Sequence, residues 1–215
     1  MKWVLKIKMQ SMLLPGAGGG SAVVDTETVH DEYGIPYIPA RRLKGLLRES
    51  ALEASEMCKL AGLKWITESD VENVFGASEE RLIVRDCRIE GYEAMKPWLA
   101  WCFAEHSSIV NWQSVLEWFT TVRSQTALEQ GVAKDGALRN MRVIEKKLIF
   151  TGVLENAGDN AAAETVAALA CANLRRMGTL RNRGLGEVVC SLQRQDGGDA
   201  IAAVLANCRR GNGYA

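Results

Sequence analysis

Two parts of the sequence combine residue types that suit contact with a phosphate-bearing ligand. The first is the stretch LLPGAGGGSA, whose glycines follow Pro15: Gly16, Gly18, Gly19 and Gly20. Glycine has no Cβ, so the backbone of such a loop can approach a ligand closely. The second is the start of an expected helix, whose first turns contain Arg41, Arg42, Lys44 and Arg48. Basic side chains oppose the helix dipole there, and their placement indicates a nearby anion.

The elements that would position these residues follow from hydrophobic periodicity. Residues 3–9 alternate apolar and charged side chains, which predicts a strand with one buried face. Residues 23–39 read as extended segments around a turn at 32–34. The other predictions are strands at 81–90, 143–155 and the end of 179–192, helices at 40–62, 160–177 and 199–208, and Gly178 as the C-cap of the second long helix.

Two stretches interrupt this order. An aromatic stretch at about 91–120 predicts a helical or mixed insert, and a polar stretch at about 121–142 predicts a long hairpin or protruding loop. Without them, the order is strand, helix, strand, strand, helix, strand, which is that of an α+β, ferredoxin-like (RRM-like) βαββαβ domain. The length of 215 residues favours one domain that spans 1–215.

Composition narrows the class of protein. Hydrophobic residues at 47% and charged residues at 24% predict a folded globular chain. The 26 basic and 26 acidic side chains cancel, so any binding of nucleic acid must depend on local clusters. Six dispersed cysteines without a CxxC pair predict buried thiols and no structural zinc. The sequence shows neither a secretory signal nor a membrane span, and we expect a soluble, cytoplasmic protein.

Five pieces of sequence carry a family resemblance: GAGGGSAVVD, DEYGIPYIPARRLKG, VFGASEERLIVRD, TVRSQTALEQGVAKDGALRNMRVIEKKLIFTG and RNRGLGEV. In this order they resemble the RAMP superfamily, most closely the small backbone subunit of type III CRISPR effector complexes, over about residues 9–189. The succession of GIPYIP, LKG and GLGEV is the specific combination. Ala40, Arg41 and Arg42 stand where the family often has glycine and serines, which leaves room for a divergent, type III-D-like member.

The resemblance implies a subunit that binds CRISPR guide RNA and target RNA beside other effector subunits, and that can self-associate into a filament. A binder of the RNA backbone needs basic side chains together with small residues. The implied RNA-binding residues are Gly18, Gly19, Gly20, Arg41, Arg42, Lys44, Arg48, Arg123, Lys134, Arg139, Arg142, Arg181, Arg183, Gly184 and Gly186. Residues 121–142 would form the family's thumb, which presses into the guide–target duplex.

Asp25 is the residue that the resemblance implies for chemistry, because its position is similar to that of the family's target-cleaving aspartate. A carboxylate there could bind a hydrated Mg²⁺ that activates the ribose 2′-hydroxyl or stabilises the departing 5′-oxygen. Asp25 is therefore the candidate both for catalysis and for metal binding. Glu27 and Asp31 are equally near, and His30 is a further candidate acid or base that can instead be structural.

Plainer structural readings stay open for several of these residues. Gly178, Gly184 and Gly186 can serve only as a helix cap and a tight entry into a strand. Residues 121–142 can be a solvated loop with ordinary surface charge. The six tryptophans are expected to pack or to contact a neighbouring subunit rather than to stack on bases.

Two other functions also stay open. The chain can be a non-catalytic scaffold subunit of the same complex, in which case Asp25→Ala would leave target cleavage unchanged. It can also be a free-standing ribonuclease that processes repeat RNA. That activity usually needs a His, Tyr and Lys arrangement, and this chain has only His30 and His106, so it ranks last.

Overall fold

The computed structural model describes residues 1–15, 24–76, 81–129, 132–158 and 162–211. Its central sheet is antiparallel, with the order β2-β8-β1-β9, and β3 also pairs with β8. The strands are β1 (Lys2–Met9), β2 (Leu82–Val84), β3 (Arg88–Ile89), β8 (Ile149–Asn156) and β9 (Val188–Arg194). The fold is therefore a mixed α+β arrangement built on an antiparallel sheet.

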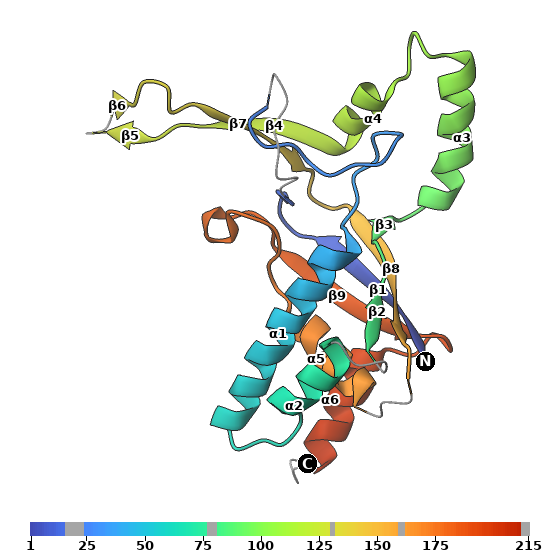
Figure 1. Ribbon diagram of the computed structural model, residues 1–215, viewed down its shortest axis with the longest axis vertical. Coiled ribbons are helices and arrows are strands. Elements are labelled where there is room, and N and C mark those ends of the chain that lie inside the picture. Colours follow the sequence, from blue (N-terminus) through green and yellow to red (C-terminus); the bar gives the residue numbers. More distant parts are fainter. Residues whose placement is uncertain (16–23, 77–80, 130–131, 159–161, 212–215) are drawn as a thin grey trace.

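Helices cover one face of this sheet (Figure 1). They are α1 (Ala40–Leu60), α2 (Glu68–Phe75), α5 (Ala163–Asn173) and α6 (Ala200–Gly211). The alternation predicted for residues 3–9 is confirmed, because Trp3, Leu5 and Ile7 are buried against the helices while the lysines of β1 point to the other face. The predicted turn at 32–34 is also present, and the amide of Gly34 donates to the carbonyl of Asp31 at 3.1 Å.

The basic start of α1 has an anion beside it, and this anion belongs to the protein. The carboxylate Oδ1 of Asp86 accepts a hydrogen bond of 2.7 Å from the amide of Ala40, the first residue of α1. Asp86 thereby satisfies one of the free amides at the helix N-terminus. The basic first turn consequently needs no phosphate to explain it.

Two predicted strands are each divided in the structure. Residues 81–90 form β2 and β3 because the chain between them turns aside, and the backbone of Cys87 exchanges two hydrogen bonds with Ile38. Residues 143–155 are divided by a turn in which Lys147 has a φ of 71°, so that the first part pairs outside the central sheet. Only β8 joins β1.

The second long helix is shorter than predicted, and Gly178 is not its C-cap. Helix α5 ends at Asn173, because the chain after it pairs with the start of β9. Arg176 bridges Glu187, and the amide of Val188 donates to the carbonyl of Arg175 at 2.9 Å. The terminal helix predicted at 199–208 is present as α6, and Asp199 caps it through the amides of residues 201 and 202.

The insert and the polar stretch form two projections on one side of the sheet (Figure 1). The insert consists of α3 (Tyr92–Glu105) and α4 (Trp112–Phe119). The polar stretch forms an antiparallel hairpin of β4 (Thr120–Gln125) and β7 (Arg139–Ile144), with β5 (Leu128–Glu129) and β6 (Val132–Ala133) near its tip. We call these four strands the thumb hairpin. It extends away from α3.

Cysteine side chains add to the core. Four of the six are buried and the other two are half-buried. Burial raises the pKa of Cys87 and of Cys190 to about 12, which keeps both as unreactive thiols. Among the residues that the structure describes, no helix is both long enough and apolar enough to cross a membrane.

Candidate nucleic-acid interface

Three segments that are far apart in sequence meet beside the thumb hairpin. The chain that follows β1 crosses to the hairpin base, where Leu13 and Ile144 exchange backbone hydrogen bonds of 3.0 and 2.7 Å. The next carbonyl, that of Leu14, accepts from the amide of Thr179 at 2.9 Å, and the amide of Gly186 donates to the carbonyl of Met12 at 2.7 Å. The stretch that leads into the glycine loop therefore lies between the hairpin and residues 178–186, which we call the 178–186 loop.

A cavity of about 780 Å³ opens between the hairpin and this loop. We call it the thumb groove. It is lined by, among others, Leu14, Thr26, Arg139, Met141, Leu180 and Arg183. Its floor is a small apolar cluster, separate from the main core, in which Leu14, Met141, Val143 and Leu185 are buried. The groove thus combines an apolar floor with arginines from two different segments.

Register places a third arginine on the same side of the hairpin. Arg123 of β4 lies opposite Met141 of β7, and Gln125 lies opposite Arg139. Residues directly opposite in an antiparallel pair, and residues two apart on one strand, share a face. Arg123 and Arg139 therefore share the face of the hairpin that carries Met141 toward the 178–186 loop.

The 178–186 loop has its shape because of close backbone approaches. A Cβ on Gly186 (φ +76°) would lie 1.9 Å from the carbonyl oxygen of Met177, and one on Gly178 (φ +81°) would lie 2.5 Å from that of Leu14. Gly184 has a similar φ of +78°, yet no atom lies within 4 Å of its Cβ position. Leu180 adopts a left-handed conformation with φ 57° at the edge of the thumb groove.

A second groove of about 690 Å³ lies on the other side of the same loop, against α1. Sequence reasoning missed two of its residues, Arg175 and Arg176. Their position just before Gly178 in the run NLRRMG was the only signal in the sequence. Arg176 donates to the carbonyl of Arg181 at 2.6 Å, and Arg181 lies 3.8 Å from the carboxylate of Glu49 on α1.

Several basic residues that the sequence assigned to one RNA surface are separated. Arg41 and Arg42 are exposed at the start of α1. Lys44 faces the β2 side of the molecule, where burial and nearby Arg81 lower its pKa. Arg48 forms an ion pair with Glu72 of α2, on that same flank.

The basic residues of the hairpin also differ in availability. Arg142 is mostly buried, and its Nε lies 2.8 Å from Glu27 Oε1. Lys134, near the hairpin tip, lies 3.5 Å from Glu129. Among the predicted arginines, Arg139 and Arg183 line the thumb groove, and Arg123 lies on the same face of the hairpin by register. Gly18, Gly19 and Gly20 lie outside the described residues.

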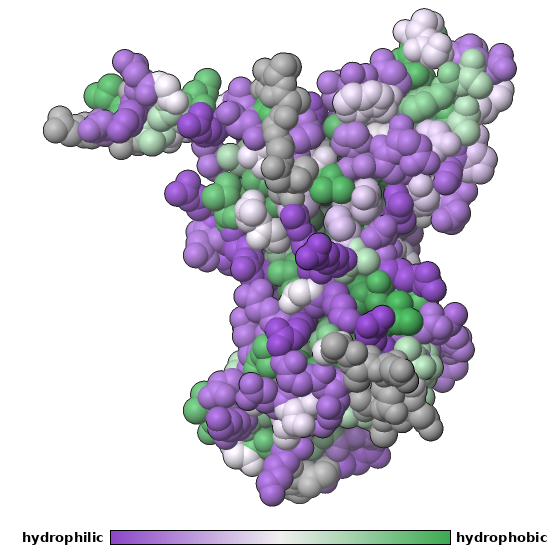
Figure 2. All heavy atoms as spheres, in the orientation of Figure 1, coloured by the Kyte–Doolittle hydropathy of each residue, from purple (hydrophilic) through white to green (hydrophobic). Residues whose placement is uncertain are grey.

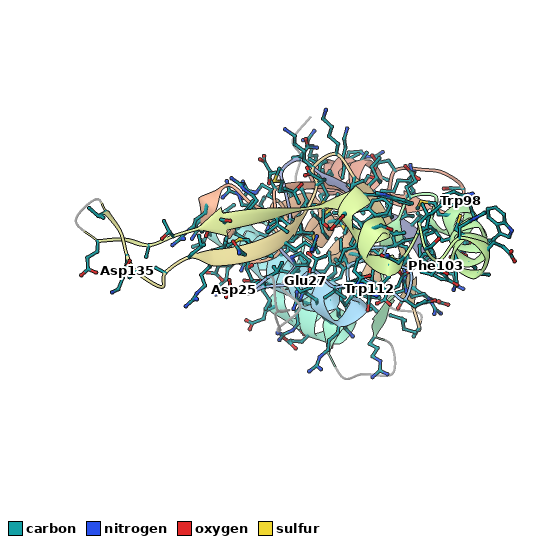
Figure 3. All side chains as sticks on the ribbon, turned by 90° about the horizontal axis from the view of Figure 1, so that it is seen from above. Asp25, Glu27, Trp98, Phe103, Trp112 and Asp135 are labelled. Carbon is teal, nitrogen blue, oxygen red and sulfur yellow. The ribbon has the colours of Figure 1, made fainter. Side chains whose placement is uncertain are left out.

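The three carboxylates after the glycine loop have different surroundings. The side chain of Asp31 is 2% exposed; it accepts hydrogen bonds from two backbone amides and lies 3.3 Å from Arg88. Glu27 is held by Arg142. Asp25 is 45% exposed, and its Oδ2 accepts from the amide of Asn140 at 2.7 Å. Figure 3 shows Asp25 and Glu27 near the base of the hairpin. Asp25 is the accessible one of the three.

His30 takes part in packing. Its ring stacks on that of Trp112 with centroids 5.1 Å apart, and its Nδ1 lies 2.9 Å from the carbonyl oxygen of Asp31. These contacts fix the segment before α1 to the insert and support the structural reading of this histidine.

Asp25 offers limited ligation for a cation. Within the described part of the chain, no group of three or more His, Cys, Asp or Glu side chains is arranged to hold a metal ion. Asp25 Oδ1 lies 3.8 Å from Arg139, whose charge competes with a cation. Protein sites bind Mg²⁺ through as few as one carboxylate when substrate phosphates complete the shell. Asp25 fits that kind of site and not an all-protein one.

The chain matches one family model in sequence and is similar in fold to solved structures. The family model of the RAMP superfamily matches residues 6–189. No curated protein matches the chain in sequence. A solved structure described as type III-B Cmr-beta bound to cognate target RNA is similar with a TM-score of 0.62, at 15% identity over 95% of this chain and 98% of that chain. The apo state of type III-B Cmr-beta gives 0.61, at 16% identity over 91% and 98%.

At these identities the structural likeness concerns the fold. The family match extends from within β1 to within β9, so it covers α1, the insert, the thumb hairpin and the 178–186 loop. A match over this much of the sequence establishes membership. The chain belongs to the RAMP superfamily.

Proposed function

We propose that this chain is a guide-RNA-binding subunit of a type III CRISPR effector complex. Family membership supports the proposal, and so does the likeness to type III-B Cmr-beta, one of whose structures is described as bound to cognate target RNA. Guide RNA, target RNA and other effector subunits would be its partners. Six free thiols suit the reducing cytoplasm as its place of action.

The proposal includes a ferredoxin-like, RRM-like core. Counting only the central sheet and its two crossover helices, the chain runs β1, α1, β2, β8, α5, β9, and the strand order is β2-β8-β1-β9. That order places the first and third strands of a βαββαβ unit at the centre of the sheet. In this description the insert and the thumb hairpin are additions between the second and third strands.

One observation carries the proposed function: the segment before the glycine loop, the thumb hairpin and the 178–186 loop surround one groove. RNA needs basic groups for its phosphates and an apolar or aromatic surface for unstacked bases. Arg139 and Arg183 line the groove and supply the first, with Arg123 on the same face of the hairpin, and the half-buried Leu180 at the groove edge supplies apolar surface for the second. The net charge of zero then causes no difficulty, because the positive charge is local.

Paired arginine variants test this groove. We expect Arg139→Ala with Arg183→Ala to weaken binding of a labelled guide RNA at least tenfold, and to lower the slope of log affinity against log salt by about 0.7 for each lost contact. The matched control is Arg81→Ala with Arg85→Ala, two exposed arginines that flank β2, which removes the same charge away from the groove. Fluorescence anisotropy of the labelled RNA measures the affinity and its salt dependence for both double variants. Equal losses in the two pairs would contradict the proposal.

Target cleavage at Asp25 is a second candidate function, favoured by the exposure of this carboxylate beside the hairpin. The hydrogen bond from the Asn140 amide holds the Asp25 side chain at the edge of β7. Arg139, 3.8 Å away, would bind a phosphate of the target RNA. A bound Mg²⁺ would supply activation of the ribose 2′-hydroxyl or stabilisation of the departing 5′-oxygen. The residues of this chain would position the target RNA strand and hold the Asp25 carboxylate in place.

Asp25→Asn tests cleavage separately from binding. The amide oxygen can still accept from Asn140, but the negative charge is gone. We expect the assembled complex to lose target cleavage about 100-fold or more while its affinity for RNA changes less than threefold. Asp135→Asn, at an exposed position near the hairpin tip, is the matched control. Unchanged cleavage in Asp25→Asn would leave the chain as a non-catalytic scaffold subunit.

The proposal also extends to self-association into a filament. Light scattering behind size-exclusion chromatography, with and without guide RNA, would show it as a mass that grows in multiples of the 23.6 kDa chain. A single mass at all protein concentrations would contradict self-association and leave the proposal of RNA binding unaffected.

A further inference from the structure

The insert exposes tryptophan side chains that the core does not use. Trp98 and Trp101 of α3 are 52% and 54% exposed, and Trp118 of α4 is 54% exposed. The rings of Trp98 and Trp118 lie 6.5 Å apart, so they form one surface across the two helices. We call Trp98, Trp101 and Trp118 the tryptophan surface.

The remainder of α3 explains why these rings are outside. Tyr92, Leu99 and Cys102 form its buried face, and Phe103 contacts Tyr33 with ring centroids 5.4 Å apart. This face attaches the helix to the segment before α1. Trp98 and Trp101 occupy the other side of the helix, one turn apart, where no fold requirement places a tryptophan.

The exposed area of these three rings is comparable to that of functional apolar patches on other proteins. At half exposure, three tryptophans leave on the order of 350 Å² of aromatic surface, which is nearly half of the roughly 800 Å² per partner in a standard protein interface. The largest apolar patch of a typical monomer covers roughly 300–600 Å² and is often functional, and the tryptophan surface falls in this range. Figure 2 shows pale and green side chains over the end of α3, whereas purple side chains predominate on the lower body.

Charge around the surface selects the class of partner. Residues 92–119 contain three glutamates and a single lysine or arginine, Lys96, which lies 3.8 Å from Glu32. Glu105 follows Trp101 by one helical turn, and Glu117 precedes Trp118, and both are exposed. Acidic neighbours repel a phosphate backbone. They attract lysine or arginine, and arginine also stacks on indole rings.

We propose that the tryptophan surface docks another protein subunit, through an apolar contact on that subunit surrounded by lysine or arginine side chains. The surface lies at the opposite end of the molecule from the thumb hairpin; Figure 3 shows Trp98 and Asp135 at the two extremes. One chain can therefore hold RNA and a protein partner at the same time. The inference uses the proposed function only to say that the partner is among the proteins of the same complex.

Co-expression of this chain with the other protein subunits of its complex tests the proposal. Trp98→Ala with Trp118→Ala should weaken incorporation of one protein subunit about tenfold or more, because aromatic anchors dominate interfaces. Native mass spectrometry reads the composition. Met57→Ala with Leu60→Ala, exposed apolar residues at the far end of α1, is the matched control and should assemble normally. Glu105→Lys with Glu117→Lys should weaken the same subunit and reverse its dependence on salt.

A photoreactive benzoylphenylalanine at position 101 identifies what lies against the surface. The proposal expects a cross-link to a different protein chain, in a peptide that carries lysine or arginine beside apolar residues. A cross-link to RNA, a cross-link to a second copy of this chain, or unchanged assembly of the tryptophan variant would each overturn it. Guide-RNA anisotropy of the isolated variants separates the two proposals, since the tryptophan variant should bind RNA normally even if the groove variant does not.

Discussion

Gly184 and Gly186, two residues apart in the 178–186 loop, show how local crowding separates glycines with similar backbone angles. Both have φ near +77°, a region that side chains rarely adopt. The Cβ position of Gly184 is open, whereas that of Gly186 is 1.9 Å from the carbonyl oxygen of Met177. The conformational cost is common to both residues, and the steric cost belongs to Gly186 alone.

Alanine at these two positions should therefore have unequal effects. We expect Gly184→Ala to lower the free energy of unfolding by about 1 kcal/mol, the cost of the left-handed conformation alone. Gly186→Ala should cost about 3 kcal/mol, because the backbone of the loop must also shift. Urea denaturation followed by circular dichroism measures both. Equal losses would mean that the Met177 contact is not maintained in solution.

At the residue scale, sequence reasoning named candidate basic residues but could not give the directions of their side chains. Arg139 and Arg183 were predicted, and the structure places both at the thumb groove. Arg142 was predicted in the same way, yet it is mostly buried against Glu27. A strand alternates its faces, so neighbouring basic residues point apart, and only packing decides which face is free. Gly18, Gly19 and Gly20 stay predictions.

At the element scale, one carboxylate connects three elements. Glu164, at the start of α5, accepts hydrogen bonds of 2.6 and 2.7 Å from Arg194 of β9 and one of 3.0 Å from Trp3 of β1. The bonds from Arg194 lower the pKa of Glu164, although partial burial opposes this effect. The ionised carboxylate therefore contributes to the stability of the folded chain.

The pH dependence of stability checks this connection. The pKa of Glu164 is lower in the folded chain than the unfolded value of about 4.3, so its contribution is complete well above that pH and is lost as pH falls through the folded pKa. Glu164→Gln should lower the free energy of unfolding by about 1–2 kcal/mol at pH 7. The difference from the unchanged protein should shrink below about pH 4. Glu105→Gln, on the exposed side of α3, should show no such convergence.

The order of the elements was readable from the sequence because each has its own periodicity. Strand β1 alternates clearly, and α1 and α6 were placed within a few residues. Boundaries failed where tertiary pairing ends an element, as at Asn173 and between β2 and β3. The insert was predicted only as helical or mixed, without helix bounds, because the outward tryptophans of α3 mask the helical alternation of its buried face.

At the scale of the whole molecule, the two projections divide the proposed work. The thumb hairpin and helix α3, which carries Trp98 and Trp101, extend in opposite directions (Figure 1). The central sheet and its helices form the base from which both projections extend, with Trp3, Leu5 and Ile7 buried in it. A subunit of this shape can bind RNA along one edge and leave the opposite edge to protein.

Cross-linking of a guide RNA that carries 4-thiouridine tests the central proposal most directly. After irradiation and nuclease digestion, mass spectrometry should find the cross-linked nucleotides on peptides that contain residues 10–15, 121–126, 139–142 and 178–186, which surround the thumb groove. Cross-links confined to α2, α6 or the tryptophan surface would contradict the proposal that guide RNA lies in this groove.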